Sequence, residues 1–265
     1  MADIPDPKNL FSLAGKTALI TGASGAFGRV AALALAKAGA KVVLAASSAA
    51  ALEKVAAEVK AAGGEARTVA RRAASEADAQ AMVDMAVNAF GSLDILVAAA
   101  GMNDPAPIVD QSLERFEAVM NANVTGSWLV CKAAGAQMIK QGRGGKVVLT
   151  SSARSVRGHP AGYGAYCTSK SAIDGLARRL GCEWGKYNIT VNAIGPTVFR
   201  SNLTAWMFAD DEKAKAVRTG FLTRLPLGRL GEPEDLVGVL LFLCSHASDF
   251  CTGQVVFVDG GYTAG

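Results

Sequence analysis

The feature that most constrains the fold is an alternation of short apolar runs with longer helical segments along most of the chain. The runs are almost continuously apolar, which is typical of strands buried on both faces of a parallel sheet. Strands that alternate with helices predict an α/β fold, and right-handed crossovers make the sheet doubly wound. We therefore expect one α/β domain over residues 1–265 with about seven strands, at residues 16–20, 41–46, 67–71, 93–98, 146–150, 189–194 and 254–258.

The composition argues against several classes of function. The net charge is +4, but the basic residues are scattered, so we expect no nucleic-acid partner. No uncharged apolar run approaches about 18 residues, so we expect no membrane span. The five cysteines form no CxxC pair, and the two histidines, His159 and His246, show no metal-ligand spacing. We therefore expect reduced thiols, no metal and a cytoplasmic protein.

A glycine-rich turn joins the first predicted strand to a helix. It reads Thr21-Gly22-Ala23-Ser24-Gly25-Ala26-Phe27-Gly28. Glycines allow the backbone to approach a pyrophosphate, and the helix N-terminus offers free N–H groups and the positive end of a dipole. The strand-turn-helix context indicates phosphate binding, and an ordinary tight turn is the alternative.

Tyr166 and Lys170 lie four residues apart in a predicted helix, so they share one face of it. A free phenol has a pKa of about 10, too high for a base at neutral pH. An ammonium group one turn away favours the phenolate and so lowers that pKa. The pair predicts proton transfer near neutral pH. The same spacing also occurs on solvated helices, so the pair needs support from other motifs.

Together the motifs resemble those of the classical short-chain dehydrogenase/reductase family, in the expected order from Lys16 to Tyr262. The matching positions are residues 21–28, Asn123, Ser152, Tyr166, Lys170, 192–196, 228–235 and 252–261. The resemblance implies a Rossmann-type sheet of strand order 3-2-1-4-5-6-7. It also implies a homotetramer or dimer, with one interface on the long fourth and fifth helices and another on the C-terminal strand and tail.

The resemblance implies an NAD(P)-dependent oxidoreductase that transfers a hydride between the nicotinamide and a ketone or secondary alcohol. Weaker similarity of residues 10–16 and 247–250 to gluconate-dehydrogenase-like members suggests a sugar acid, a polyol or a cyclic alcohol as substrate. A 3-oxoacyl-thioester reductase is the alternative. An inactive binding or scaffold protein of the same fold is the alternative from another functional class.

The resemblance also assigns catalytic roles. Tyr166 would exchange a proton with the substrate oxygen, and Lys170 would lower the pKa of Tyr166 and hold the nicotinamide ribose. Ser152 would hydrogen-bond the reacting oxygen, and Asn123 would hold a water that relays the proton outward. Taken alone, Ser152 also reads as a capping hydroxyl and Asn123 as a helix interruption. The spacing to Tyr166 is about one residue longer than usual, so Ser151 is the alternative catalytic serine.

The positions that the resemblance assigns to the cofactor are Gly22, Ser24, Gly25, Ala26, Phe27, Gly28, Ser47, Arg72, Ala73, Ala99, Ala100, Gly101, Tyr166, Lys170, Pro196, Thr197 and Phe199. Some of these depart from the family pattern. Residues 98–101 read Ala-Ala-Ala-Gly where the family usually has Asn-Asn-Ala-Gly, Thr197 replaces a glycine, and Arg72 stands where an aspartate is common.

The choice between cofactors depends on the end of the second strand. An acid there would bind the ribose 2′-hydroxyl and repel a 2′-phosphate, but this chain has Ala46-Ser47-Ser48. Ser47 and Arg72 suit a 2′-phosphate, so we expect NADP(H) in preference to NAD(H). Two observations leave NAD(H) open: Arg72 also reads as a solvated charge, and Gly25 replaces a basic residue that NADP-using members often carry.

The substrate is expected over Tyr166, beneath a lid formed by residues 197–224. Trp206, Met207 and Phe208 would either wall the pocket or form the core of the lid. Four side chains flank the expected site and would either pair with a substrate carboxylate or remain solvated: Arg154, Arg157, His159 and Arg200. Residues 1–14 are expected to form an N-terminal extension.

Overall fold

The computed structural model describes residues 6–265, and its centre is one seven-stranded parallel sheet. The strand order is β3-β2-β1-β4-β5-β6-β7, so the predicted order is confirmed. The strands are β1 (Thr17–Thr21), β2 (Lys41–Ala45), β3 (Ala66–Val69), β4 (Ile95–Ala98), β5 (Gly145–Thr150), β6 (Ile189–Pro196) and β7 (Val255–Val258).

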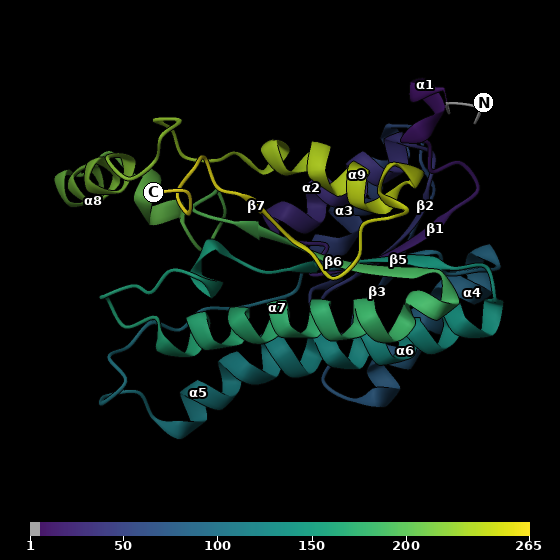
Figure 1. Ribbon diagram of the computed structural model, residues 1–265, viewed down its shortest axis with the longest axis horizontal. Helices are drawn as coiled ribbons and strands as arrows, with labels where there is room; N and C mark the ends of the chain where they lie inside the picture. The colour runs from purple at the N-terminus through teal and green to yellow at the C-terminus, as the bar shows by residue number, and fades with distance from the viewer. Residues whose placement is uncertain (1–5) are drawn as a thin grey trace.

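Helices cover both faces of the sheet (Figure 1). On one face lie α2 (Ala26–Lys37), α3 (Ala49–Ala61) and α9 (Val237–Cys244). On the other lie α4 (Glu76–Phe90), α6 (Gly126–Gln141) and α7 (Gly164–Trp184), with α5 (Leu113–Met120) beside α7. The remaining α-helices are α1 (Pro7–Leu10) and α8 (Glu212–Leu222). Residues 1–5 of the predicted extension lie outside the described residues.

The core has two layers because the strands are buried on both faces. One cluster fills the space between the sheet and α4, α6 and α7, and includes Leu19, Leu96 and Leu149. The other lies beneath α2, α3 and α9 and includes Ile20 and Leu44. Consecutive residues Leu19 and Ile20 belong to opposite layers, as the two-residue period of a strand requires.

One helical segment departs from regular geometry. The sequence over residues 110–138 predicts mostly helix, and Asn121, Asn123 and Thr125 interrupt its apolar pattern. The structure has α5 and α6 joined without a loop by one π-helical turn, Asn121–Thr125. Single π-turns within α-helices are frequently found at functional sites. This turn places the Asn123 side chain in the interior, where only 1% of the residue is exposed.

The site is located where the strand order reverses. β1 pairs with both β2 and β4, and the chains that leave β1 and β4 cross to opposite faces of the sheet. In open α/β sheets the crevice at such a switch point, at the carboxyl ends of the strands, is where ligands bind. The helix α8 lies close to the C-terminus of the chain (Figure 1).

Candidate active site

The glycine turn after β1 brings backbone into close contact with the segment after β4. Gly22 has a φ of +63°, and a Cβ atom there would lie 2.7 Å from the Ala100 Cα. A Cβ atom on Gly28 would lie 2.2 Å from the Gly22 carbonyl oxygen. Gly25 precedes α2 without a side-chain cap. The first N–H groups of α2 are therefore left open toward the crevice, as an anion-binding helix N-terminus requires.

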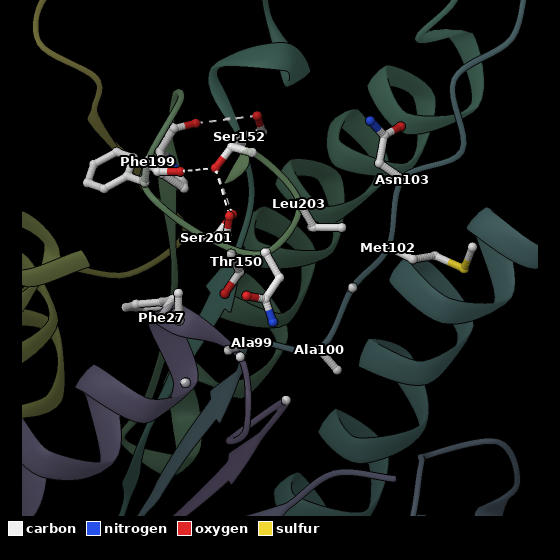
Figure 2. A pocket seen from close by; sticks show the side chains of 18 of the residues that line it. Phe27, Ala99, Ala100, Met102, Asn103, Thr150, Ser152, Phe199, Ser201 and Leu203 are labelled. Atoms are coloured by element: carbon white, nitrogen blue, oxygen red, sulfur yellow. Dashed lines mark hydrogen bonds between the residues drawn. The ribbon is translucent and has the colours of Figure 1, made fainter. Parts of the chain in front are cut away.

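This turn lines a cavity of about 810 Å³. Figure 2 shows Phe27, Ala99, Ala100, Ser152 and Leu203 around it. The predicted cofactor residues line the cavity with one exception, Lys170. The lining contains four arginines and no aspartate or glutamate: Arg71, Arg72, Arg154 and Arg200.

The residues present fit a dinucleotide. The buried Thr150 hydroxyl lines the cavity and has no hydrogen-bond partner within the described chain, so it is available to a bound polar group. A side chain at Gly22 or Gly28 would collide with backbone atoms of the turn itself or of Ala100. Together with a lining that carries positive and no negative charge, these features suit an elongated anionic ligand.

Ser152 and its neighbour Ser151 lie in different environments. Ser152 follows β5, lines the cavity, and donates to the Pro196 carbonyl oxygen at 3.3 Å. The Ser151 hydroxyl donates to the carboxylate of Asp174 on α7 and does not line the cavity. Neighbouring residues of an extended segment point to opposite sides, so only one serine faces the ligand space. Ser152 is therefore the one of the two serines that lines the cavity.

Tyr166 lines the same cavity, but its acidity differs from the sequence expectation. Burial raises the pKa of the Tyr166 phenol, while hydrogen bonding to Ser152 and the charge of Arg154 act in the opposite direction. The sequence-based prediction of a lowered Tyr166 pKa was therefore wrong in its net direction. The physical reason is that withdrawing the phenol from water disfavours the phenolate more than the surrounding charges favour it.

Lys170 lies behind Tyr166, one turn along α7, and is only 4% exposed. Its Nζ donates to the Thr150 carbonyl oxygen at 2.6 Å and lies 5.5 Å from the centre of the Tyr166 ring. Burial lowers the pKa of Lys170 to about 8, and the charge of Asp174 on the same helix raises it. The ammonium group is thus less basic than a surface lysine.

Asn123 supports the loop after β4 and does not line the cavity. Its amide accepts from the Met102 N–H at 2.7 Å and donates to the Met102 carbonyl oxygen and to the Ser169 hydroxyl, both at 2.9 Å. A Cβ atom at Gly101 would lie 3.1 Å from the Asn123 Oδ1. The side chain therefore fixes the position of this loop against α7, and its role in a proton relay stays a prediction.

The end of the cavity beyond β2 and β3 carries the residues expected to select the cofactor. Ser47 and Arg72 are both exposed and line the cavity there. The neighbouring Arg71 also lines it, but its Nη1 pairs with Asp78 at 3.0 Å. Arg72 has no carboxylate partner in the described part of the chain, so its charge is available to a ligand.

Residues 197–224, which include α8 and the short helix Ala205–Phe208, contribute to the lining of the cavity at its opposite end. Trp206 lines the cavity and is 48% exposed, whereas Met207 is buried although it also lines the cavity. Met207 belongs to a small third core with Phe221 and Tyr262, and Phe208 packs against that core. Of the two predicted alternatives, Trp206 therefore follows the first and walls the cavity. Met207 and Phe208 follow the second and pack in the core of the 197–224 segment.

The four basic side chains expected to flank the site differ in their hydrogen-bond partners and in whether they line the cavity. Arg200 hydrogen-bonds Glu232 at 3.0 and 3.1 Å and lies over the Phe208 ring. Arg157 donates to the backbone of the C-terminal residues Thr263 and Gly265 and does not line the cavity. Arg154 and His159 line the cavity beside Tyr166.

Several lining residues were missed from the sequence. Asn103 has a buried Oδ1 with no partner in residues 6–265, and Tyr163 packs edge-on to Tyr166 with ring centres 6.4 Å apart. Tyr163 is the N-cap residue of α7, three positions before Tyr166, and this spacing is a sequence signal for a shared face. Asn103 lies in a loop, and no local pattern indicates where its side chain points.

Within the described residues, no group of three or more His, Cys, Asp or Glu side chains could hold a metal ion. The search of residues 6–265 also finds no helix long and apolar enough to cross a membrane.

Comparisons with known proteins agree with this architecture. A family model described as enoyl-(acyl carrier protein) reductase matches residues 22–263. An uncharacterized oxidoreductase of Mycobacterium tuberculosis is 53% identical over 96% of this chain and 93% of its own length. A 2-dehydro-3-deoxy-D-gluconate 5-dehydrogenase of Dickeya dadantii is 36% identical over 97% of this chain and 98% of its own.

A solved structure has the same fold over nearly the whole chain. The gluconate 5-dehydrogenase of Burkholderia cenocepacia, in complex with NADP and tartrate, superposes with a TM-score of 0.90 at 32% identity, covering 97% of this chain and 98% of its own. The fold, the motif order and these relatives agree. The chain therefore belongs to the short-chain dehydrogenase/reductase family of NAD(P)-dependent oxidoreductases.

Proposed function

We propose that the protein transfers a hydride between NADP(H) and a ketone or secondary alcohol, with Tyr166 as the general acid and base. The observation that carries this proposal is that Ser152 and Tyr166 line the same cavity as the glycine turn, although they are more than 120 residues away from it in the chain. A bound nicotinamide supplies or accepts the hydride, and the protein orients the groups that exchange the proton.

In the reduction direction, the substrate oxygen accepts a hydrogen bond from the Ser152 hydroxyl and a proton from the Tyr166 phenol as the carbonyl carbon gains the hydride. The Lys170 ammonium then stabilises the phenolate that remains. Oxidation reverses each step: the phenolate takes the alcohol proton as the hydride leaves. The raised pKa of Tyr166 suits its role as the acid, because the phenol holds its proton at neutral pH until the substrate oxygen becomes basic.

The test of this mechanism is Tyr166→Phe, which removes the proton donor and keeps the ring. We expect turnover to fall by a factor of about 10² to 10⁴ while NADPH binding changes less than about twofold. Tyr163→Phe is the matched control, because it removes the hydroxyl of the neighbouring ring at the N-cap of α7. Failure of the wild-type protein to bind either nicotinamide cofactor would instead favour the inactive scaffold.

NADP(H) is proposed over NAD(H) because the ribose end of the cavity carries Ser47 and the unpaired Arg72 and no carboxylate. Arginine binds phosphate by charge-assisted hydrogen bonds, which an acid at this place would oppose. Solved relatives with bound NADP include the gluconate 5-dehydrogenase above and a 2-deoxy-D-gluconate 3-dehydrogenase candidate from Agrobacterium tumefaciens. These relatives support the preference and leave its strength to measurement.

Side-by-side fluorescence titrations with NADPH and NADH test the preference. Arg72→Gln should raise the NADPH dissociation constant by a factor of about 10 to 150, because a hydrogen bond to a charged group contributes about 1.5–3 kcal/mol. The NADH constant should stay within about twofold. Arg178→Gln, an exposed arginine of α7 outside the cavity, serves as the control. Tighter binding of NADH than NADPH by the wild type would overturn the preference.

The substrate is proposed to be a small hydroxylated compound such as a sugar acid, a polyol or a cyclic alcohol, held beneath residues 197–224 as a lid. Relatives named for such substrates include the Dickeya enzyme and a D-threitol dehydrogenase of Mycolicibacterium smegmatis. The description of the matching family model favours a second candidate, a 3-oxoacyl-thioester reductase. Faster NADPH oxidation with acetoacetyl-thioesters than with hydroxylated ketones would favour the second candidate.

Assembly into a homodimer or homotetramer is proposed from the outer face of α6 and α7. A groove of about 400 Å³ there is lined by Val124, Trp128, Leu176 and Arg179, among others. Trp128 is 46% exposed. A large aromatic side chain in an exposed apolar groove is typical of a protein interface. Light scattering during size-exclusion chromatography should give two or four times 27.2 kDa, and Trp128→Glu should lower that mass.

A further inference from the structure

The cavity carries unbalanced positive charge at both of its ends. Of its four arginines, Arg71 pairs with Asp78 and Arg200 with Glu232. Arg72 and Arg154 have no carboxylate partner within residues 6–265. Arg72 lies at the end assigned above to the cofactor. Arg154 lies at the other end, beside Tyr166, where the cofactor phosphates do not account for it.

Arg154 is held in place by neutral groups. Its Nη1 donates to the Gly158 carbonyl oxygen and to the Tyr262 hydroxyl, both at 2.9 Å. The guanidinium also lies over the Tyr262 ring, 5.2 Å from its centre. Tyr262 is itself 3% exposed and stacks on Phe221 of α8. The C-terminal segment and α8 therefore fix the orientation of Arg154 without neutralising its charge.

The unused donors of Arg154 are suited to an anion. Nε and Nη2 have no hydrogen-bond partner within the described chain, and these two N–H groups form one edge of the guanidinium fork. A fork edge of this kind binds a carboxylate with two parallel hydrogen bonds. The charge of Arg154 already acts on Tyr166, Cys167 and His159, so Arg154 lies within electrostatic reach of the reacting group.

The other basic groups near Arg154 do not compete for this role. Arg224 lies over the Tyr262 ring, 4.9 Å from its centre, and does not line the cavity. Arg157 is engaged by the C-terminal backbone, as described above. Burial, Arg154 and Arg224 all lower the pKa of His159, so its ring is neutral near pH 7. Its Nδ1 accepts from the Ala161 N–H at 3.0 Å, which leaves the proton on Nε2. His159 is therefore a neutral hydrogen-bond donor.

We propose that Arg154 is the anchor for a carboxylate group of the substrate, and that Tyr262 is the positioning residue that orients this anchor. The protein would thus act on hydroxy acids or keto acids in preference to neutral alcohols and ketones of the same size. This proposal rests on the proposed function, because it assigns the substrate class of the same site. Arg154 binds the carboxylate, while Ser152 and Tyr166 face the reacting oxygen elsewhere on the same molecule.

A matched pair of ligands tests the proposal: D-gluconate and the uncharged D-gluconamide, each with NADP⁺. We expect the wild type to use the acid with at least a tenfold higher kcat/KM than the amide. Arg154→Gln should lower kcat/KM for the acid about 10-fold to 100-fold, chiefly through KM, and change that for the amide less than threefold. Arg154→Lys should retain part of the preference, and Arg178→Gln should retain all of it.

The role of Tyr262 is tested by Tyr262→Phe, which keeps the stacked ring and removes the hydroxyl that Arg154 donates to. We expect KM for D-gluconate to rise about threefold while kcat and the KM for D-gluconamide stay unchanged. Equal losses for the acid and the amide would assign both residues a structural role only and would overturn the proposal. Unchanged melting temperatures of the variants establish that they fold.

Binding without turnover separates this proposal from the proposed function. Calorimetric titration of the protein with D-gluconate and D-gluconamide in the presence of NADP⁺ needs no reaction. If only the acid binds to the wild type and Arg154→Gln abolishes this binding, carboxylate binding by Arg154 is supported even where no hydride transfer is detected. If both ligands bind equally, or if Arg154→Gln binds the acid as the wild type does, the anchor is refuted.

Discussion

Asp174 provides a sharp test of the electrostatics around the proposed catalytic pair. It is 4% exposed on α7, one turn beyond Lys170, and accepts a hydrogen bond from Ser151. Its charge raises the pKa of Lys170 against the effect of burial, which brings that pKa to about 8. Asp174→Asn removes the charge but keeps an Oδ1 that accepts from Ser151, so the packing should be preserved.

The size of the effect follows from the helix geometry. Unit charges about 7 Å apart on adjacent turns interact by about 2 kcal/mol at an effective dielectric constant of about 20. That energy corresponds to about 1.5 pKa units. We therefore expect Asp174→Asn to lower the pKa of Lys170 clearly below its present value of about 8.

The direction of the pH dependence follows from the proposed mechanism. Carbonyl reduction needs a protonated Lys170 and a protonated Tyr166. Lys170 loses its proton first as pH rises, because its pKa is lowered and that of Tyr166 is raised. Hence kcat/KM for reduction should fall above about pH 8 in the wild type. In Asp174→Asn the same fall should begin at a pH about 1.5 units lower.

The assay is NADPH oxidation with one ketone substrate between pH 5.5 and 10. Glu183→Gln on the exposed face of α7 is the control, and its profile should match that of the wild type. An alkaline limb that stays in place, or moves to higher pH, in Asp174→Asn would refute the assigned coupling between Asp174 and Lys170. A uniform loss at all pH values would instead assign Asp174 a structural role.

Three further substitutions test the packing around the site. Gly28→Ala places a Cβ 2.2 Å from the Gly22 carbonyl oxygen, so NADPH affinity should fall at least tenfold in a fluorescence titration; unchanged affinity would contradict the close approach. Gly135→Ala places a Cβ 2.5 Å from Trp184, and overpacking of this kind should lower the free energy of unfolding in denaturant by about 1–3 kcal/mol. A stabilised variant would instead show that α6 and α7 can move apart. Leu149→Ala empties a fully buried position of β5 and should cost about 2–5 kcal/mol, and a loss under 1 kcal/mol would contradict a close-packed core there.

The fold was accessible from the sequence because its signals are local. Apolar runs such as residues 41–46 and 93–98 identified β2 and β4 to within two residues at each end. The turn at residues 21–28 was placed correctly because strand, glycines and helix follow one another directly. The sequence indicated that the helix is interrupted near Asn121–Thr125, but it did not indicate a π-helical turn. That geometry goes with the hydrogen bonds of Asn123 to Met102 and Ser169, which are distant in the chain.

The sequence predicted which residues line the site more completely than it predicted the chemistry of those residues. The motifs named Ser152 and Tyr166, and the structure places both on the cavity with the glycine turn. The acidity of Tyr166 was predicted with the wrong sign, because the spacing to Lys170 shows a nearby charge but not the burial of the phenol. Desolvation depends on every element that packs around a group, and no short segment contains that information.

What the sequence by itself determined is the sheet, the glycine turn after β1 and the residues proposed for proton transfer, because each follows from residues close together in the chain. The tertiary structure alone decided which serine lines the cavity and which basic side chain beside Tyr166 keeps its charge unpaired. Asp174 engages Ser151, Glu232 engages Arg200, and the C-terminal backbone engages Arg157, which leaves Ser152 on the cavity and Arg154 there without a carboxylate partner in the described residues. These pairings join residues 23 to 108 positions apart, so only the folded chain brings the partners within hydrogen-bond distance.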